Sequence, residues 1–293
     1  MRIFVKCMHG IGDGLWARPF VRQLVNEGHD LYLETPLPFI YGDLPVKFVR
    51  PAQTHRTQEK YLDQTSYTFV DKPEVDKSIN FFYSHDEMKK HGIMTHMEQA
   101  FGYEPGSIQF EMDMPSNLPS HGLQLPNKKI AIIRPVTQRK EWLCTSRSPK
   151  PQYVAWCARI LKDMGYYTIS VADCVEDEEW IEQGGDSNAD LKLHNGELGL
   201  EKTFNLFKSA DLVVTGDGFA VPAAIAAKTN VFIIFGGRGK YSNPHKLFDL
   251  RMDMKKIGWA IPDNFCRCAS MEHDCDKEIT NLDSQFFNFM RTI

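Results

Sequence analysis

The sequence predicts an α/β protein made of two doubly wound domains. Short apolar runs alternate with amphipathic segments along most of the 293 residues, the pattern of parallel sheets covered by helices. A proline-rich stretch at residues 113–128 interrupts this alternation, and the chain is long enough for two domains of ordinary size. We therefore expect domains at 1–120 and 121–265 that face a central cleft, and a tail at 266–293 that can pack back on the first domain.

The first half contains the elements of one parallel sheet. An apolar run at 3–5 predicts the first strand, and apolar residues at helical spacing from Trp16 to Val25 predict the next helix. Further strands are expected at 31–33, 46–49, 67–70 and 79–83. The segment 85–101 has helical periodicity, interrupted near Gly92. Strands and helices joined by short loops imply right-handed parallel crossovers.

The second half starts a new series of elements after the proline-rich stretch. Strands are expected at residues 130–133, 167–171, 212–214 and 231–235. Helices are expected at residues 151–164, 200–209 and 220–227. The last of these helices is built from small residues, which allow close packing against a sheet. This order predicts a second doubly wound sheet.

Composition and charge argue against several classes of protein. The chain is 42% hydrophobic and 25% charged, as ordinary globular proteins are. A net charge of −4 gives no overall basic field for nucleic acid, although a local basic groove would suffice. No segment approaches the roughly 20 apolar residues of a membrane span, and the first strand is too short for a signal peptide. The seven cysteines are odd in number and four are scattered, so we expect a cytoplasmic protein. The oligomeric state stays open.

The strand-to-helix turn at residues 8–15 is the first candidate site. Its three glycines allow positive φ angles or the close approach of a ligand. Asp13 stands where a helix N-cap is expected, at the sheet edge where open α/β sheets bind ligands. Two interpretations stay open for Asp13, a helix cap and a catalytic carboxylate. The glycine spacing differs from G-x-G-x-x-G, which argues against a nicotinamide dinucleotide.

A second candidate site follows the strand at 130–133. Its cationic side chains are Arg134, Arg139, Lys140, Arg147 and Lys150, and Thr137 lies among them. Cations after a core strand suit a diphosphate, and a solvated basic loop is the alternative. Aromatic residues among them are limited to Trp142, so a groove for single-stranded nucleic acid is not indicated.

Two further turns of the second half carry candidate ligand-binding groups. At Gly216, Asp217 and Gly218 a strand ends and a helix begins, so backbone N–H groups there could hold an anion. Asp217 would either cap that helix or bind a sugar hydroxyl. Glu176 belongs to an acidic run that could accept hydroxyl protons of a ribose, or that could form an acidic helix N-terminus.

Three cysteines lie close together near the end of the sequence. They are Cys266, Cys268 and Cys275, and His273 stands between the last two. Four potential ligands suggest zinc, but the spacing fits no C-x₂-C pattern. We therefore expect neither a metal nor another cofactor.

The chain resembles the heptosyltransferase-like proteins, glycosyltransferase family 9, of GT-B fold. Residues 10–19 are similar to the opening G-x-G-D-x-L-x-x-x-P of that family, and residues 200–237 resemble its second signature. The cysteine-bearing tail also has a counterpart in many members. The resemblance implies two Rossmann-like domains, a nucleotide-sugar donor held mainly by the second, and inverting transfer without a metal. It also implies that Asp13 is the general base.

The second signature departs from the family pattern. Pro222 stands where the family has a histidine, and Arg134-Pro135-Val136 stands in place of H-P-G. These changes lie in the donor site, so they leave the transferred sugar open.

We therefore predict a metal-independent, inverting glycosyltransferase that uses a nucleotide-diphosphate sugar. The expected acceptor is a lipopolysaccharide-like or lipid-linked glycan, or a hydroxylated base of DNA. The alternatives are a non-catalytic nucleotide-sugar-binding protein and a nucleotide-sugar isomerase or hydrolase, for which His9 is the nearest further acid or base. The expected donor-binding residues are Arg134, Thr137, Arg139, Lys140, Arg147, Glu176, Gly216, Asp217 and Gly218. The expected acceptor-side residues are His9, Gly12, Gly14 and Arg18.

Overall fold

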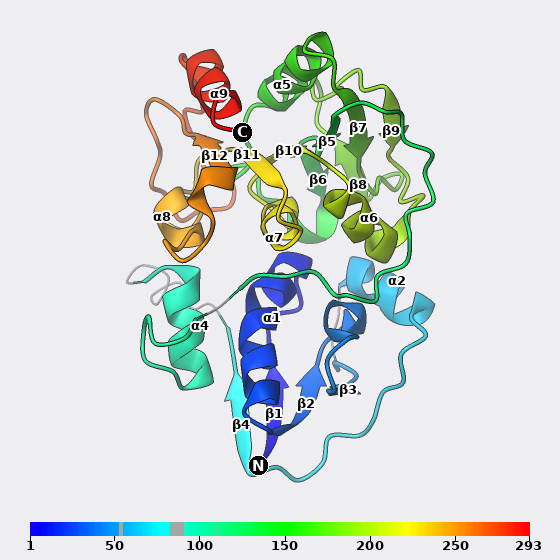
Figure 1. The fold of residues 1–293 in the computed structure, drawn as a ribbon. Helices are drawn as coiled ribbons and strands as arrows, with labels where there is room; N and C mark the ends of the chain where they lie inside the picture. Colours follow the sequence, from blue (N-terminus) through cyan, green and yellow to red (C-terminus); the bar gives the residue numbers. More distant parts are fainter. Residues whose placement is uncertain (53–54, 83–90, 110) are drawn as a thin grey trace. The chain divides into compact units, whose positions relative to one another are not determined.

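The computed structural model describes residues 1–52, 55–82, 91–109 and 111–293, which form two compact units (Figure 1). The first unit consists of Met1–Leu118 and Lys246–Met252, and the second of Pro119–His245 and Asp253–Ile293. The division at 118 falls inside the proline-rich stretch, where proline and glycine prevent a long regular element.

The first unit is built on a four-stranded parallel sheet. Its elements are β1 (Arg2–Lys6), α1 (Ile11–Asn26), β2 (Asp30–Glu34), the 3-10 helix η1 (Pro38–Tyr41), β3 (Lys47–Val49), α2 (Arg56–Gln64), β4 (Lys77–Asn80) and α4 (Ile93–Phe101). The strand order is β3-β2-β1-β4, so the first strand of the chain is central. Its apolar residues are buried, which is why β1 reads as a continuous apolar run.

Two expectations for the first unit differ from the structure. The strand predicted at 67–70 is only a bridge between Phe69 and Phe48, so it extends the sheet edge at a single point. Of the helix predicted at 85–101, the structure shows α4, which begins after Gly92. Residues 83–90 lie outside the described part of the chain.

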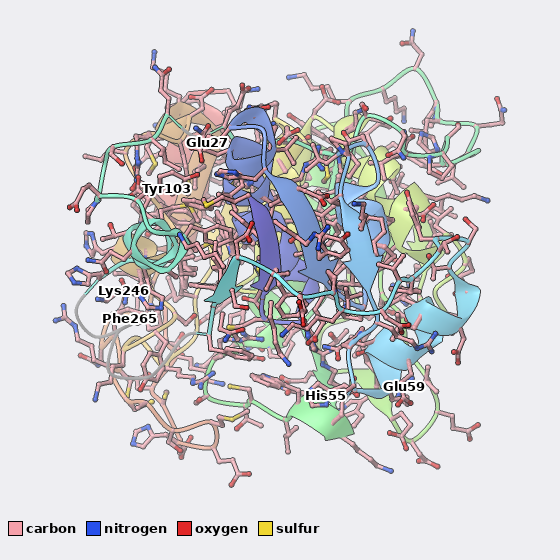
Figure 2. All side chains as sticks on the ribbon, turned by 90° about the horizontal axis from the view of Figure 1, so that it is seen from below. Glu27, His55, Glu59, Tyr103, Lys246 and Phe265 are labelled. Carbon is pink, nitrogen blue, oxygen red and sulfur yellow. The ribbon has the colours of Figure 1, made fainter. Side chains whose placement is uncertain are left out.

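Helices of the first unit pack on one another through aromatic side chains. Phe20 of α1 and Phe101 of α4 have ring centroids 5.3 Å apart. Just beyond α4, the Tyr103 hydroxyl donates a 2.9 Å hydrogen bond to Glu27 Oε1 at the end of α1, and Figure 2 shows the two side chains together. Both contacts hold α4 against α1.

The second unit is built on a six-stranded parallel sheet. Its elements are β5 (Ile130–Ile133), β6 (Thr137–Arg139), η2 (Lys140–Trp142), α5 (Pro151–Asp163), β7 (Tyr167–Val171), β8 (Glu179–Ile181), β9 (Leu191–Leu193), α6 (Gly199–Lys208), β10 (Leu212–Gly216), α7 (Ala220–Ala226), β11 (Asn230–Ile234), η3 (Met254–Lys256), β12 (Ile257–Ala260) and α9 (Leu282–Met290). The short helix α8 (Pro244–Leu247) begins in this unit and ends in the segment assigned to the first unit. The strand order is β12-β11-β10-β5-β7-β9, the doubly wound Rossmann order. The two α/β units therefore have the predicted fold class.

Strands that the sequence did not predict are short and partly polar. β6 and β8 form a separate antiparallel ribbon of Thr-Gln-Arg against Glu-Trp-Ile. β9 and β12 add to the two edges of the six-stranded sheet. Such strands lack the long apolar run that marks a central strand, so periodicity does not find them.

The tail 266–293 belongs to the second unit, whereas the sequence suggested that it packs on the first. Its helix α9 places Phe286 and Phe289 against Phe232 of β11, with ring centroids 5.1 and 5.7 Å away. Gly258 of β12 makes room for this contact, since a Cβ atom there would overlap the Phe289 ring. The segment that returns to the first unit is Lys246–Met252 instead. The described residues contain no helix long and apolar enough to cross a bilayer.

Candidate functional site

Asp13 lies in the first turn of α1, just after the carboxyl end of β1. The N-cap of α1 is Gly10, with φ −70° and ψ 147°, so Asp13 is the third residue of the helix. The expectation that Asp13 occupies the N-cap position is therefore wrong. A carboxylate in the first turn is still favoured by the positive end of the helix dipole.

The glycines of this turn provide space rather than unusual backbone angles. Gly10, Gly12 and Gly14 all lack a positive φ, contrary to one of the two roles expected for them. A Cβ atom on Gly10 would overlap Asp13 Oδ2, so the carboxylate folds back over Gly10. A Cβ atom on Gly14 would lie 2.9 Å from the side chain of Ile40 in η1. Close approach therefore explains Gly10 and Gly14.

Two of the groups near Asp13, Cys7 and Tyr41, are buried and stay neutral. Burial, with the charge of Asp13 as a second cause, raises the pKa of the Cys7 thiol to about 12. Burial also raises the pKa of Tyr41, and the Asp13 charge adds to that effect. The Tyr41 hydroxyl donates a 2.8 Å hydrogen bond to Gly14 O. The negative charge of Asp13 thus lies near groups that stay protonated at neutral pH.

His9 and Glu34 add a second titratable pair at the same sheet edge. His9 follows β1 and Glu34 ends β2, and His9 Nε2 lies 3.6 Å from Glu34 Oε1. Glu34 also forms a 2.8 Å ion pair with Lys6, while Gln58 of α2 donates to His9 O at 3.0 Å. The pair is mostly buried, with 19% and 12% of the side chains exposed. Sequence reasoning named His9 but missed Glu34, which only the parallel pairing of β1 and β2 brings to it.

The Arg18 side chain is buried in the first unit and is held there by ion pairs and a hydrogen bond. Its side chain is 1% exposed and forms ion pairs with Asp43 at 2.8 Å and Asp113 at 2.9 Å. It also donates to Ile40 O at 2.6 Å. These contacts favour a structural role over the expected acceptor-side role, which stays a prediction.

Three arginines of the second unit form a second candidate site, named here the arginine cluster: Arg134, Arg139 and Arg147. The ribbon of β6 and β8 places Arg139 opposite Glu179. Burial lowers the pKa of Arg139, the charges of Glu179 and Glu141 raise it, and the charges of Arg147 and Arg134 lower it. The three guanidinium groups are therefore close enough to repel one another, and a bound anion would offset that repulsion.

The three arginines differ in how strongly they are held. Arg134 donates to Val171 O at 2.9 Å and to Thr137 Oγ1 and Glu179 Oε1 at 3.3 Å. Arg139 lies 3.7 Å from Glu141 and keeps 38% of its side chain exposed. Among the residues that the structure describes, no side-chain hydrogen bond or ion pair is found for Arg147. Arg139 and Arg147 are therefore better placed to bind a ligand than Arg134.

The carboxyl ends of β10 and β11 lie against the segment that carries Arg147. A Cβ atom on Gly216 would come within 3.0 Å of Pro149, and one on Gly236 would overlap the carbonyl oxygen of Ser148. Asp217 accepts a hydrogen bond from the Ser242 hydroxyl at 2.5 Å. Asp217 does not cap α7, whose N-cap is Phe219 without a side-chain bond.

Glu176 and Lys140 are exposed residues near the ribbon. Glu176 lies in the turn between β7 and β8, so the alternative of an acidic helix N-terminus is wrong. The Lys140 ammonium lies 3.9 Å from Glu178, and its backbone N–H donates to Glu178 O at 2.9 Å. These contacts fix the turn beside the arginine cluster.

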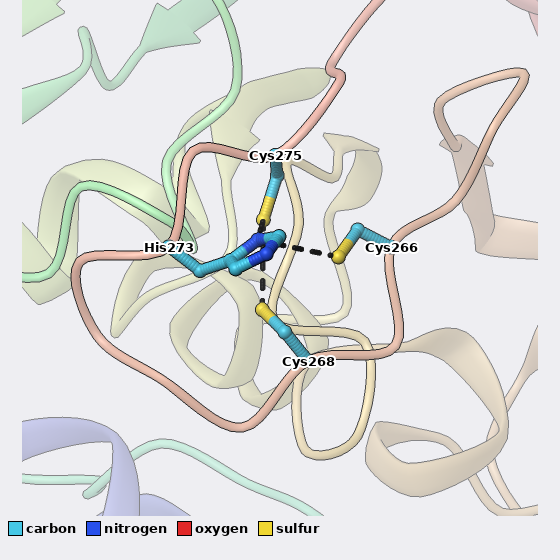
Figure 3. Close-up of side chains that lie close together, drawn as sticks. All are labelled: Cys266, Cys268, His273 and Cys275. Carbon is cyan, nitrogen blue, oxygen red and sulfur yellow. Dashed lines mark hydrogen bonds between the residues drawn. The ribbon is translucent and has the colours of Figure 1, made fainter.

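The cysteines and the histidine of the tail form a third site (Figure 3). The ligand atoms of Cys266, Cys268, His273 and Cys275 all lie within 4.8 Å of one another. The four residues are named here the Cys₃His cluster. The spacing argued against a metal, but the fold brings the four donors together through a loop with a bend at 271–272 that periodicity does not reveal. This is a donor set that a tetrahedral metal ion accepts.

Comparisons with known proteins give likeness of fold. No protein-family model and no curated protein matches the sequence. Among solved structures, the iron-containing dodecameric glycosyltransferase TibC of enterotoxigenic E. coli has a TM-score of 0.62 at 13% identity, covering 99% of this chain and 78% of that one. The E. coli ADP-heptose lipopolysaccharide heptosyltransferase II has a TM-score of 0.58 at 13% identity, covering 99% of both chains. E. coli heptosyltransferase WaaC with ADP has a TM-score of 0.60 at 12% identity, covering 98% and 97%. The chain therefore has the GT-B fold of these glycosyltransferases.

Proposed function

We propose that this protein is a glycosyltransferase that moves a sugar from a nucleotide-diphosphate donor to an acceptor hydroxyl with inversion at the anomeric carbon. The observation that carries the proposal is the Asp13 carboxylate, held over Gly10 at the carboxyl end of β1. That edge of a parallel sheet is where ligands bind. Likeness of fold to sugar transferases over both units supports the same proposal.

The proposed reaction needs one base and a stabilised leaving group. The acceptor O–H gives its proton to the Asp13 carboxylate while its oxygen forms a bond to the anomeric carbon. The bond from that carbon to the diphosphate oxygen breaks, and the nucleoside diphosphate leaves with the electron pair. Attack opposite the leaving group inverts the anomeric configuration.

Arg139 and Arg147 are the proposed ligands of the donor diphosphate. Guanidinium groups bind phosphate oxygens in bidentate fashion and stabilise the charge that develops on the leaving group. Arg134 is already bound to Val171 O and paired with Glu179, so we assign it no direct contact with the diphosphate. We therefore propose that no divalent metal is needed at the phosphates.

Adenosine diphosphate is the first donor nucleotide to test. Solved structures of similar fold are named as complexes with ADP and with an ADP-heptose. Pro222, which replaces the family histidine in α7, leaves the sugar to be determined. For the acceptor we propose a hydroxyl of a glycan, since one structure of similar fold is named a lipopolysaccharide heptosyltransferase.

Calorimetric titration with ADP, UDP, GDP and CDP tests the donor site. We expect one nucleotide to bind, and Arg147→Ala or Arg139→Ala to weaken it by roughly 10- to 100-fold, the loss of a charged hydrogen bond. Arg159→Ala, an exposed arginine of α5, is the matched control and should bind as the wild type does. Equal binding by all variants would place the nucleotide elsewhere.

Release of nucleoside diphosphate from its sugar, with candidate glycan acceptors, tests Asp13. Asp13→Asn should lower kcat by roughly 10²- to 10⁴-fold, the usual value of general base catalysis, at unchanged donor affinity. Asp63→Asn, an exposed aspartate of α2 with 74% of its side chain accessible, is the control. Donor binding without turnover on any acceptor would favour the non-catalytic sugar-nucleotide-binding alternative.

A further inference from the structure

The Cys₃His cluster lies in a long connection between β12 and α9. Residues 261–281, all of them described, contain neither helix nor strand. Loops of this length without secondary structure are uncommon in compact domains and are often functional. Cys275 is 7% exposed and Ile279 is 4% exposed, so these two side chains pack the connection against the rest of the second unit.

Three of the six distances between the ligand atoms are close to those around one tetrahedral ion, and all six are within 4.8 Å. His273 Nδ1 lies 3.5 Å from Cys266 Sγ and 3.3 Å from Cys275 Sγ, and the sulfurs of Cys268 and Cys275 are 3.5 Å apart. Zinc–sulfur and zinc–nitrogen bonds of the usual lengths give edges of about 3.5–3.8 Å in a tetrahedron. In Figure 3 the four side chains lie together, and the dashed lines mark contacts between them.

Hydrogen bonds hold the loop after β11 against the segment that carries the cluster. The Lys240 N–H donates to Cys268 O at 3.3 Å, and Arg238 Nε donates to Ala269 O at 3.4 Å. Arg238 has a φ of 56°, a strained angle for a residue with a side chain, which costs energy unless its surroundings use it. Contacts that fix the backbone carrying the ligands are part of the outer shell expected of a metal site.

Small residues bring the backbone against the cluster. A Cβ atom on Gly237 would overlap Cys275 Sγ, so only glycine fits there. A Cβ atom on Gly239 would lie 3.0 Å from Cys266 O, and the Gly239 N–H donates to that oxygen at 2.8 Å. The loop after β11 therefore closes one side of the site.

We propose that Cys266, Cys268, His273 and Cys275 hold one tetrahedral metal ion, for which zinc is the first choice. Three thiols lose their protons to solvent as the ion binds, and the imidazole coordinates through Nδ1. All four positions are filled by protein, so the ion has a structural role and takes no part in the transfer reaction.

The ion fixes a segment that leads into the arginine cluster. Ser146 N–H donates to Met271 O at 3.0 Å, and the Ser146 hydroxyl donates to Ser270 O at 2.6 Å. Met271 and Ser270 lie between the ligands Cys268 and His273. Because Arg147 follows Ser146, we expect metal binding to position Arg147, a consequence that rests on the proposed function.

A disulfide is the alternative arrangement of these cysteines. A bonded pair needs sulfurs about 2.0 Å apart. A disulfide would also not explain why the third cysteine and the histidine lie beside the other two. The Cys268 and Cys275 sulfurs lie 3.5 Å apart, and all seven cysteines of the chain are free. The geometry favours a metal over a disulfide.

Metal analysis of the full-length protein, purified without chelator, tests the proposal. We expect one equivalent of zinc, or of iron in the same site, per chain, and near-complete loss of it in Cys268→Ser and His273→Ala. Cys174→Ser is the matched control, because Cys174 is a half-exposed cysteine of the second unit outside the cluster, and it should keep the metal.

Cobalt exchange gives a spectroscopic test that does not depend on activity. Protein stripped and reloaded with Co²⁺ should show the strong visible bands of a tetrahedral thiolate site. His273→Cys supplies a fourth thiolate and should retain the metal with a shifted spectrum. This variant guards against the possibility that loss of metal in the other variants only reflects misfolding.

Either of two results would overturn the proposal. One is equal metal content in the wild type and in soluble, folded Cys268→Ser and His273→Ala. The other is metal-free wild-type protein whose intact mass is two hydrogens below the value for free thiols, which would identify a disulfide. Nucleotide titration of the same samples is a separate readout, so a protein that holds metal but binds no nucleotide would refute the proposed function alone.

Discussion

Arg251 and Glu98 lie 153 positions apart in the sequence and form an ion pair inside the first unit. Arg251 Nη1 donates to Glu98 Oε1 at 2.6 Å, and Arg251 Nη2 donates to Oε2 at 3.1 Å. Glu98 is fully buried, and its Oε2 also accepts from the Gly106 N–H at 2.9 Å. This bidentate ion pair attaches the segment Lys246–Met252 to the rest of the first unit, residues Met1–Leu118.

Arg251→Ala should destabilise the first unit by roughly 3 kcal/mol, because it leaves the buried Glu98 carboxylate without its counter-charge. Urea unfolding followed by a probe of the first unit measures the effect. Arg291→Ala, at the exposed end of α9 in the second unit, is the matched control and should leave the midpoint unchanged. An unchanged midpoint for Arg251→Ala would show that the ion pair does not support the fold.

Acid should weaken the same segment through Asp249. The hydrogen bond from Arg251 holds the pKa of Asp249 below its ordinary value of 3.8. A depressed pKa in the folded state means that the stabilisation is complete above the unfolded pKa and is lost as pH falls through the folded pKa. The unfolding free energy of the wild type should fall below about pH 4 as Asp249 is protonated. Asp249→Asn has no carboxylate at this position, so its unfolding free energy should fall less over the same pH range. Denaturant titrations from pH 6 downward measure it, and parallel pH profiles for the two proteins would contradict it.

Gly10→Ala should impair catalysis with little effect on stability. The backbone angles of Gly10 suit alanine, but the added Cβ would overlap Asp13 Oδ2 and displace the carboxylate. A misplaced base should lower kcat by roughly 10- to 100-fold, within what general base catalysis contributes. Transfer assays together with thermal unfolding and nucleotide titration separate these effects. Wild-type kcat in Gly10→Ala would mean that the position of Asp13 does not matter for the reaction.

Gly236→Ala should destabilise the second unit and weaken nucleotide binding together. The added Cβ would overlap backbone oxygens of Arg147 and Ser148, which cannot move aside as a flexible side chain can. We expect a loss of roughly 1–3 kcal/mol, the usual cost of overpacking. Gly218→Ala is the stability control, since a Cβ there meets nothing within 4 Å. Retained stability with retained nucleotide affinity would show that the segment carrying Arg147 adjusts freely.

Local pattern was sufficient for most of the fold. The alternation of apolar runs with amphipathic segments predicted both sheets, because a strand buried on two faces has to be apolar along its length. It also located the turn that carries Asp13, since glycines and a carboxylate between strand and helix form a local signal. Short polar strands such as β6 and β8 were missed because their pairing partners are distant in sequence.

By itself, the sequence determined the α/β class, two domains and the position of Asp13 at a sheet edge. Only the tertiary structure decided that the tail packs on the second unit, that Arg18 is buried between Asp43 and Asp113, and that four dispersed ligands meet in the Cys₃His cluster. The physical reason is that periodicity records which face of an element is buried. It does not record which distant side chain neutralises a buried charge or completes a set of ligands, because these depend on where loops bring residues together in space.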